Sequence, residues 1–324
     1  MKCGHCKAEG HSKKTCPALQ ETKYPKPPVK WVGGKSSIVD EVLSQFPKYM
    51  NNYIEPFLGG GSVLLAILTL WQQDTIQING DIYAFDNNPN LIGLYRNIQS
   101  HCNELIIDLQ EIVANYRAIQ GDTVNRAATT LEEARGSRES YYYWIRSTFN
   151  AMTAEEKISI RGSALLLFLN KTCFRGLYRE GPHGLNVPFE KQNQNLTIFD
   201  EFHLRQLSNL IQGVHFQCKI FQDTLAFAKN GDFIYLDPPY APEKANSFVG
   251  YNADGFSGEQ HALLFDNVHK LVERGVKVVM SNADVPLVRQ AFPAPYVTQV
   301  ISVRRAIHSK KPNSRTNEVL ITHP

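Results

Sequence analysis

The sequence has no apolar run long enough to cross a lipid bilayer, and it does not begin like a secretory signal peptide. Its first six residues include a lysine, a glycine and a histidine, whereas a signal peptide needs an apolar stretch after its positive end. It also contains no internal repeat and no low-complexity tract. These absences argue against membrane, secreted and repeat proteins, and we expect a soluble intracellular protein.

Cysteine is scarce and unevenly placed, with six residues in a chain of 324. Three of the six fall within the first sixteen residues, whereas Cys102, Cys173 and Cys218 are isolated from one another. In a reducing compartment, lone cysteines act as small buried hydrophobic side chains, and clustered cysteines indicate a metal site. We therefore expect no disulfides and a metal site near the N-terminus.

The net charge is small, at +3, but the two ends of the chain differ from its middle. Residues 1–35 carry a charge of +6 and residues 301–324 a charge of +4, so the stretch between them carries −7. Two basic ends suit a polyanionic partner that contacts both of them. Ordinary solvated surface charge explains the same distribution equally well.

Four metal-binding side chains have the C-x2-C-x4-H-x4-C spacing of a zinc knuckle, namely Cys3, Cys6, His11 and Cys16. A closed structural zinc site uses four such ligands and no water, and so short a segment depends on the metal to fold. The spacing is similar to that of nucleocapsid-like knuckles, which bind unpaired bases. No aromatic residue lies between Cys3 and Cys16, so we expect an electrostatic contribution to binding rather than sequence reading.

Short apolar runs that end in polar residues alternate with longer helical patterns. Strands are predicted at 53–54, 82–85, 233–236 and 276–280, directly before Glu55, Asp86, Asp237 and Ser281-Asn282. Helices are predicted at 62–70 and 258–271. This alternation implies an α/β fold with a doubly wound, Rossmann-like sheet, in which ligands bind beyond the carboxyl ends of the strands.

A glycine-rich segment follows the first predicted strand and runs from Glu55 through Phe57, Gly59 and Gly61 to Ser62. Glycines at this position let the backbone approach a ligand closely, although such turns are common. The segment lacks the lysine and hydroxyl pair of a P-loop, which argues against a nucleoside triphosphate.

Asp86 lies 25 residues beyond Gly61, at the end of the second predicted strand. A carboxylate in this place can take both ribose hydroxyls of an adenosine. The alternative is that Asp86 caps the helix that follows.

The most specific motif is Asp237-Pro238-Pro239-Tyr240, in which two prolines fix the backbone and remove two N–H donors. An adenine amino group is a poor nucleophile because its lone pair is delocalised into the ring. If the Asp237 carboxylate and the Pro238 carbonyl accept its two hydrogens, the lone pair is directed at an incoming methyl group. Tyr240 would stack on the base, which must flip out of a duplex to reach such a pocket.

Together with Lys30-Trp31-Val32-Gly33-Gly34-Lys35, these segments resemble the Dam family of DNA adenine-N6 methyltransferases, of the D12 class and alpha group. The resemblance extends from residue 30 to residue 322. It implies S-adenosylmethionine as the cofactor, direct methyl transfer without a catalytic metal, and zinc only in the knuckle. It also implies double-stranded DNA as the partner, bound by a monomer or weak dimer, with GATC as the family's common target.

The resemblance also implies roles for individual residues. The residues that would surround the cofactor are Trp31, Gly34, Lys35, Glu55, Phe57, Gly59, Gly61, Ser62, Asp86 and Asp237. Those that would act on the base are Asp237, Pro238 and Tyr240, and those that would face the DNA are Lys30, Arg175, Leu177 and Arg179. Arg175 stands where the family usually has asparagine, which leaves the target sequence open. An arginine here can grip guanine or contact a phosphate.

The predicted domains are the zinc knuckle at residues 1–20, a Pro/Lys linker at 21–29, a cofactor-binding catalytic domain at 30–105 and 215–324, and an inserted, mostly helical target-recognition domain at 106–214. Two other functions stay open. One is methylation of a different amino group, either cytosine N4 or a protein glutamine amide. The other is a catalytically inactive nucleic-acid-binding protein that retains its knuckle, although the motifs are intact.

Overall fold

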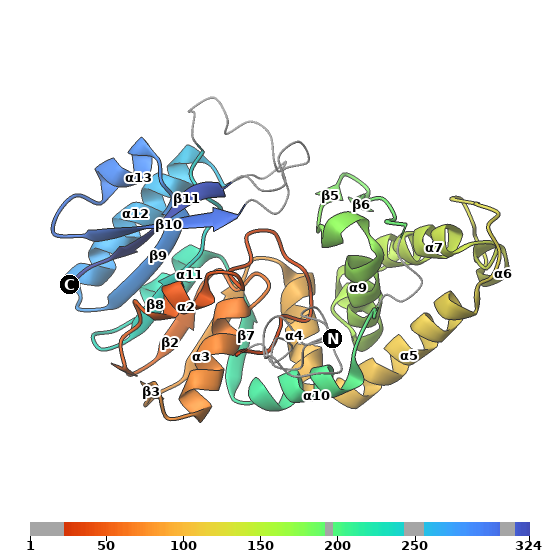
Figure 1. Ribbon diagram of the computed structural model, residues 1–324, viewed down its shortest axis with the longest axis horizontal. Coiled ribbons are helices and arrows are strands. Elements are labelled where there is room, and N and C mark those ends of the chain that lie inside the picture. Colours follow the sequence, from red (N-terminus) through yellow and green to blue (C-terminus); the bar gives the residue numbers. More distant parts are fainter. Residues whose placement is uncertain (1–22, 192–196, 243–255, 305–314) are drawn as a thin grey trace, which may run out of the picture.

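The computed structural model describes residues 23–191, 197–242, 256–304 and 315–324. The predicted zinc ligands Cys3, Cys6, His11 and Cys16 therefore lie outside the described residues. Within them, one sheet contains the strands β2 (Tyr53–Glu55), β4 (Ile82–Asp86), β7 (Val214–Cys218), β8 (Phe233–Leu236), β9 (Lys277–Ala283), β10 (Val297–Arg304) and β11 (Arg315–Thr322). Their order across the sheet is β10-β11-β9-β8-β2-β4-β7 (Figure 1).

The central strands of this sheet run parallel. β2 pairs with β4 on one side and with β8 on the other, while β7 and β9 extend the parallel part outward. β11 is antiparallel to both β9 and β10. All four predicted strands are confirmed, and because β8, β2 and β4 are neighbours, Asp237, Glu55 and Asp86 meet at one edge of the sheet.

Helices cover both faces of the sheet, as a doubly wound fold requires. One face carries α2 (Val39–Leu43), α3 (Ser62–Gln72) and α4 (Pro89–Ser100). The other carries α11 (Phe221–Ala226), α12 (Gly258–Glu273) and α13 (Pro286–Ala291). The predicted helices at 62–70 and 258–271 correspond to α3 and α12. Six consecutive residues of α3, from Val63 to Leu68, are buried. Burial of each large aliphatic side chain among them stabilises the folded state by roughly 1.5–3 kcal/mol.

The region between α4 and β7 is mostly helical and lies beside the sheet (Figure 1). It contains α5 (Cys102–Ala118), α6 (Leu131–Ala134), α7 (Arg138–Ala151), α8 (Ala154–Lys157), α9 (Ile160–Thr172) and α10 (Glu201–Leu210). α9 packs against α4, α5 and α7, and one hydrophobic cluster runs from α3 and α4 into these helices. The helical region therefore shares its core with one face of the sheet. The domain boundaries stay a prediction.

Two shorter pairings complete the described fold. β1 (Tyr49–Met50) pairs with β3 (Gln77–Ile78), and β5 (Glu180–Gly181) forms a hairpin with β6 (Gly184–Leu185). A 3-10 turn, η2 (Phe174–Gly176), follows α9 and precedes this hairpin. Among the residues that the structure describes, no helix combines the length and apolar character needed to cross a membrane.

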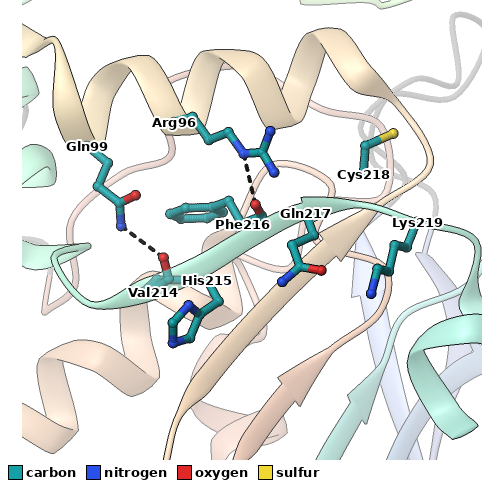
Figure 2. Close-up of a pocket in the computed structure, with 8 residues that line it drawn as sticks. All are labelled: Arg96, Gln99, Val214, His215, Phe216, Gln217, Cys218 and Lys219. Carbon is teal, nitrogen blue, oxygen red and sulfur yellow. Dashed lines mark hydrogen bonds between the residues drawn. The ribbon is translucent and has the colours of Figure 1, made fainter. Parts of the chain in front are cut away.

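The outer edge of β7 is covered by side chains from α4 (Figure 2). The Arg96 Nε donates to the Phe216 carbonyl at 2.9 Å, and the Gln99 Nε2 donates to the Val214 carbonyl at the same distance. Gln99 also donates to the carbonyl of Ile211 at 2.7 Å. These side chains occupy backbone acceptors that a further strand would otherwise use.

Candidate active site

An ion pair between Lys35 and Asp237 lies where β8 ends. The Lys35 Nζ is 2.7 Å from the Asp237 Oδ2, and the two side chains are 4% and 18% exposed. Lys35 reaches this position from a turn in which the Gly34 N–H donates to the Trp31 carbonyl at 3.2 Å. Gly33 has a φ of 80° in this turn, a conformation that strongly favours glycine, and its carbonyl accepts a bond from Lys35 Nζ at 2.5 Å. The sequence therefore builds a loop that returns a lysine to the carboxylate.

The electrostatic setting of Asp237 suits a hydrogen-bond acceptor. Burial raises the pKa of its carboxyl above the usual value, the Lys35 ammonium opposes that rise, and the negative charge of Glu318 adds to it. Its second oxygen, Oδ1, is buried and has no hydrogen-bond partner among the described residues. A buried acceptor without a partner is costly, which points to a donor from a bound ligand.

Tyr240 stands beside this ion pair. The Lys35 Nζ lies 4.9 Å from the centre of its ring, and its hydroxyl donates to the Glu318 Oε2 on β11 at 2.7 Å. The next residue is anchored too, since the Ala241 N–H donates to the Asn282 Oδ1 at 3.0 Å. A cavity of about 700 Å³ opens next to Tyr240 and is lined in part by Val285, Asn317 and Glu318.

The glycine-rich loop between β2 and α3 has two residues with positive φ, Gly59 at 50° and Gly61 at 73°. A Cβ on Gly61 would overlap the Tyr95 hydroxyl, and one on Gly59 would lie 3.2 Å from the Trp31 ring. The Tyr95 hydroxyl also donates to the Gly60 carbonyl at 2.7 Å. The loop is thus held by aromatic side chains that leave no room for a side chain at Gly61.

Asp86 ends β4 and faces this loop. Its Oδ2 accepts the Gly59 N–H and its Oδ1 accepts the Asn88 N–H, both at 2.9 Å. Burial raises the pKa of Asp86, and these backbone donors oppose the rise. The helix-cap alternative for Asp86 is wrong, because the N-cap of α4 is Asn88, whose side chain accepts the Leu91 N–H at 3.1 Å. Asp86 keeps free acceptor positions on both oxygens, since a carboxylate can accept about four hydrogen bonds.

Glu55 is the last residue of β2, and its side chain does not reach the surface. It is 2% exposed and accepts the Tyr53 hydroxyl at 2.7 Å. Burial raises the pKa of Glu55 to about 8, the Tyr53 hydrogen bond opposes that rise, and the charges of Asp237 and Asp86 add to it. Three carboxyl groups therefore lie close together at the ends of neighbouring strands.

Phe57 belongs to an aromatic cluster that the sequence did not predict. Its ring stacks on Phe221 at a centroid distance of 5.7 Å and meets Phe256 edge-on at 6.0 Å. Phe221 begins α11, directly after β7, so predicting β7 would have drawn attention to it. Glu318, which accepts the Tyr240 hydroxyl, was also not identified from the sequence.

The predicted DNA-facing residues lie around η2, and we call Arg175–Leu177 the recognition turn. Arg175 is exposed and has a φ of 56°, a strained value for a residue other than glycine. Its guanidinium lies 5.1 Å from the ring of the exposed Phe174, and its N–H donates to the Glu190 Oε2 at 2.9 Å. Arg179 donates to the Asn186 Oδ1 at 2.6 Å and is exposed.

The structure brings the predicted cofactor and base residues into one region and places the DNA-facing residues next to it. Trp31, a predicted cofactor residue, lies next to the DNA-facing group. Its ring centre is 5.0 Å from that of Tyr178, two residues beyond Gly176. Ser62 is also part of the arrangement, because its Oγ accepts the Lys35 N–H at 3.0 Å. No cluster of three or more possible metal ligands occurs within the described ranges.

Doubly wound folds bind nucleotide-like ligands at the carboxyl edge of the sheet, which is where this site lies. The family model for D12 class N6 adenine-specific DNA methyltransferases matches residues 31–307. The chain is 31% identical to the type II methyltransferase M.MjaIII of Methanocaldococcus jannaschii over 265 residues, 80% of this chain and 84% of that protein. It is 30% identical to the DNA adenine methylase of Escherichia coli K12 over 87% of this chain and 88% of that protein. The Haemophilus influenzae DNA adenine methylase is 31% identical over 90% of each chain.

The chain belongs to the D12 class of N6 adenine-specific DNA methyltransferases. Its substrate is DNA, and S-adenosylmethionine is the cofactor that membership of this family implies. The residues present fit such a cofactor, because a glycine loop without side chains faces the Asp86 carboxylate and a partnerless oxygen of Asp237 lies nearby. The family match begins after the predicted zinc ligands.

Proposed function

We propose that this chain methylates the N6 of an adenine that is flipped out of a short site in duplex DNA. The cofactor supplies an electrophilic methyl group carried on a sulfonium. Trp31, Gly34, Lys35, Phe57, the Gly59–Gly61 loop with Ser62, and Asp86 would hold it. Glu55 would belong to the same set, and its buried carboxyl accepts the Tyr53 hydroxyl.

Asp237 and Pro238 accept the hydrogens of the adenine amino group, and Tyr240 stacks on the base. The observation that carries this proposal is the Asp237 carboxylate. Lys35 holds one of its oxygens, and the other is buried without a partner in the described residues. An acceptor held in this way costs no reorganisation when a donor arrives. The Tyr240–Glu318 hydrogen bond fixes the ring that would meet the base.

The Asp237→Asn variant tests the role of this acceptor. It keeps the size of the side chain but puts an N–H donor near the amino hydrogens, so methyl transfer should fall by about a hundredfold or more. Cofactor affinity, measured by calorimetry, should change much less. Transfer by Asp237→Asn at close to the wild-type rate would contradict the assignment.

We further propose GATC as the target, with Lys30, Arg175, Leu177 and Arg179 facing the DNA. The test is incubation of the purified protein with plasmid DNA and S-adenosylmethionine, followed by sequencing that detects N6-methyladenine at each base. Methylation confined to GATC supports the proposal. Methylation of another sequence contradicts the target and makes Arg175→Asn the first substitution to make. N4-methylcytosine would contradict the choice of base, and cofactor binding without methylation would indicate an inactive binding protein.

We also propose that Cys3, Cys6, His11 and Cys16 bind a structural zinc ion, which adds affinity for the DNA backbone. Elemental analysis of the purified protein should find one zinc ion per chain. The Cys3→Ser, Cys6→Ser double variant should lose the metal and show a weaker dependence of DNA affinity on salt. Loss of zinc with an unchanged salt dependence would rule out the contribution to DNA binding.

A further inference from the structure

Asn170 lies near the end of α9, and only 4% of it is exposed. Its side chain bonds to the backbone of two separate segments. The Oδ1 accepts the Lys30 N–H at 2.8 Å, and the Nδ2 donates to the Lys30 carbonyl at 2.9 Å and to the Gly176 carbonyl at 3.0 Å. The acceptor and both N–H groups of this amide are therefore used to join the two segments.

The two segments belong to different parts of the site. Lys30 directly precedes Trp31, whose side chain packs on the glycine loop at Gly59 and Gly60. Gly176 belongs to the recognition turn, and it sits directly on Lys30, since a Cβ on Gly176 would overlap the Lys30 side chain. Asn170 thus ties the turn expected to read the DNA to the segment expected to hold the cofactor.

A second buried asparagine, Asn97, provides a comparison because its hydrogen bonds lie outside the site. Asn97 on α4 is 8% exposed, and its Nδ2 donates to the Ile158 carbonyl at 2.9 Å and to the Ser163 Oγ at 2.8 Å. These partners lie at the start of α9 and just before it, away from η2 and from Lys30. Asn97 and Asn170 are therefore matched in burial and in donor use, but only Asn170 bonds to the site.

We propose that Asn170 is a positioning residue for target recognition, which fixes the recognition turn relative to Lys30. The inference rests on the proposed function of this turn in reading DNA. Displacements of about 1 Å are enough to weaken catalysis and recognition strongly. Loosening the turn therefore lowers discrimination between the target and a related sequence more than it lowers affinity for the cofactor.

The test compares Asn170→Asp with Asn97→Asp. Each substitution keeps the size of the side chain and replaces its N–H donors with a carboxylate oxygen. In Asn170→Asp this oxygen faces two carbonyl oxygens, whereas in Asn97→Asp it faces one carbonyl and the Ser163 hydroxyl, which can turn to donate to it. For both variants, kcat/KM is measured on a duplex carrying the target found by sequencing and on one with a single changed base pair. KM for S-adenosylmethionine and the thermal unfolding midpoint are measured alongside.

In Asn170→Asp, the ratio of the two kcat/KM values should fall by about tenfold, the scale of one base contact. KM for S-adenosylmethionine should change less. In Asn97→Asp the ratio should stay at the wild-type value even where the unfolding midpoint falls as far. If Asn170→Asp does not fold, Asn170→Ser, which is smaller and carries no charge, takes its place.

An unchanged ratio in the Asn170 variant, or an equal fall in the Asn97 variant, overturns the inference. Arg179→Ala separates this failure from failure of the proposed function. If Arg179→Ala lowers the ratio and the Asn170 variant does not, only the role of Asn170 is wrong. If neither lowers it, the residues around the turn do not read the DNA, and both proposals fail.

Discussion

Two carboxyl groups at neighbouring strand ends differ in the partner that each one has. Asp237 faces the ammonium of Lys35, which favours its charged form, whereas Glu55 accepts the hydroxyl of Tyr53 and lies near the negative charges of Asp237 and Asp86. Burial disfavours charge at both positions. Asp237 is therefore suited to accept hydrogen bonds as a carboxylate, and Glu55 is suited to remain protonated near neutral pH.

Glu55 should make the stability of the protein depend on pH. Its pKa rises from an ordinary value of 4.5 to about 8 in the folded protein, so between these values the folded state holds a proton that the unfolded state has lost. The stabilisation present at low pH is lost as pH rises through this range, by up to about 1.4 kcal/mol per pH unit. The Glu55→Gln variant keeps an acceptor for Tyr53 and stays neutral. It should match the wild type near pH 5 and be the more stable of the two near pH 8.

Thermal unfolding at both pH values, without cofactor, measures this difference. Glu41→Gln on the exposed side of α2 is the control, because it makes the same chemical change without burial. If Glu55→Gln lowers stability equally at both pH values, the carboxyl is charged in the folded protein and the assignment is wrong.

At the level of elements, the loop between β2 and α3 depends on glycine for two separate reasons. Gly61 combines a positive φ with the close approach of the Tyr95 hydroxyl, which fills the space that a Cβ would need. Gly213, before β7, has a similar φ of 79°, but a Cβ added there would meet no described atom within 4 Å. These two glycines therefore separate the cost of the backbone conformation from the cost of the steric overlap.

Gly61→Ala should lower cofactor affinity and stability, because Tyr95 or the loop must move to admit the new methyl group. Gly213→Ala should cost only the conformational strain, about 1–2 kcal/mol. Calorimetric titration with S-adenosylmethionine and thermal unfolding measure the two effects. Equal reductions in both variants would show that strain alone accounts for the result and that the packing of Tyr95 is unimportant.

The strands that could be predicted from the sequence are those buried on both faces. The four residues of β8 are all buried and appear in the sequence as one apolar run. β7 lies at a side of the sheet and alternates between buried and more exposed residues over much of its length, whereas β11 is more exposed in its first half and buries three consecutive residues near its end. Neither β7, β11 nor β10 was predicted, because polar residues interrupt most of their length and leave at most three apolar residues in a row.

The candidate site could be predicted in the same partial way. Residues at strand ends were identified because parallel strands bring their carboxyl ends to one edge. Pairs such as Lys35 with Asp237 and Tyr240 with Glu318 join segments far apart in the sequence, and no local pattern relates them. The N-cap of α4 could not be assigned from the sequence either. Asp86 and Asn88 are both good capping residues, and only the structure shows that Asn88 is the cap.

Across the whole molecule, positive charge gathers where the N-terminal segment meets the helical region. Burial lowers the pKa of Lys171 to about 8, and the nearby charges of Lys30 and Lys26 contribute to the decrease. Lys26 and Lys30 are exposed, and the Lys26 carbonyl is bonded to His203 on α10 at 2.8 Å. This cluster suits the phosphates of a DNA duplex.

The Lys26→Gln, Lys30→Gln double variant should weaken DNA binding and reduce its dependence on salt. Removing one lysine–phosphate interaction lowers the slope of log affinity against log salt by about 0.9. The Lys229→Gln, Lys277→Gln double variant is the matched control, because it removes two exposed lysines near the amino ends of β8 and β9 and thus at the opposite edge of the sheet. Titrations at several salt concentrations measure the slope. An equal change in the control would mean that only the overall charge matters.

The covered edge of β7 limits how copies of this protein can assemble. A sheet with two open edges can grow without end, because each added copy exposes a new edge. Here Arg96 and Gln99 occupy two backbone acceptors on one side, and within the described residues no strand pairs with the far side of β10. Strand addition at β7 would have to displace these side chains from the carbonyls of Val214 and Phe216. Where copies crowd on a single DNA molecule, pairing of their sheets through β7 is therefore disfavoured by the same two side chains that hold α4 against this strand.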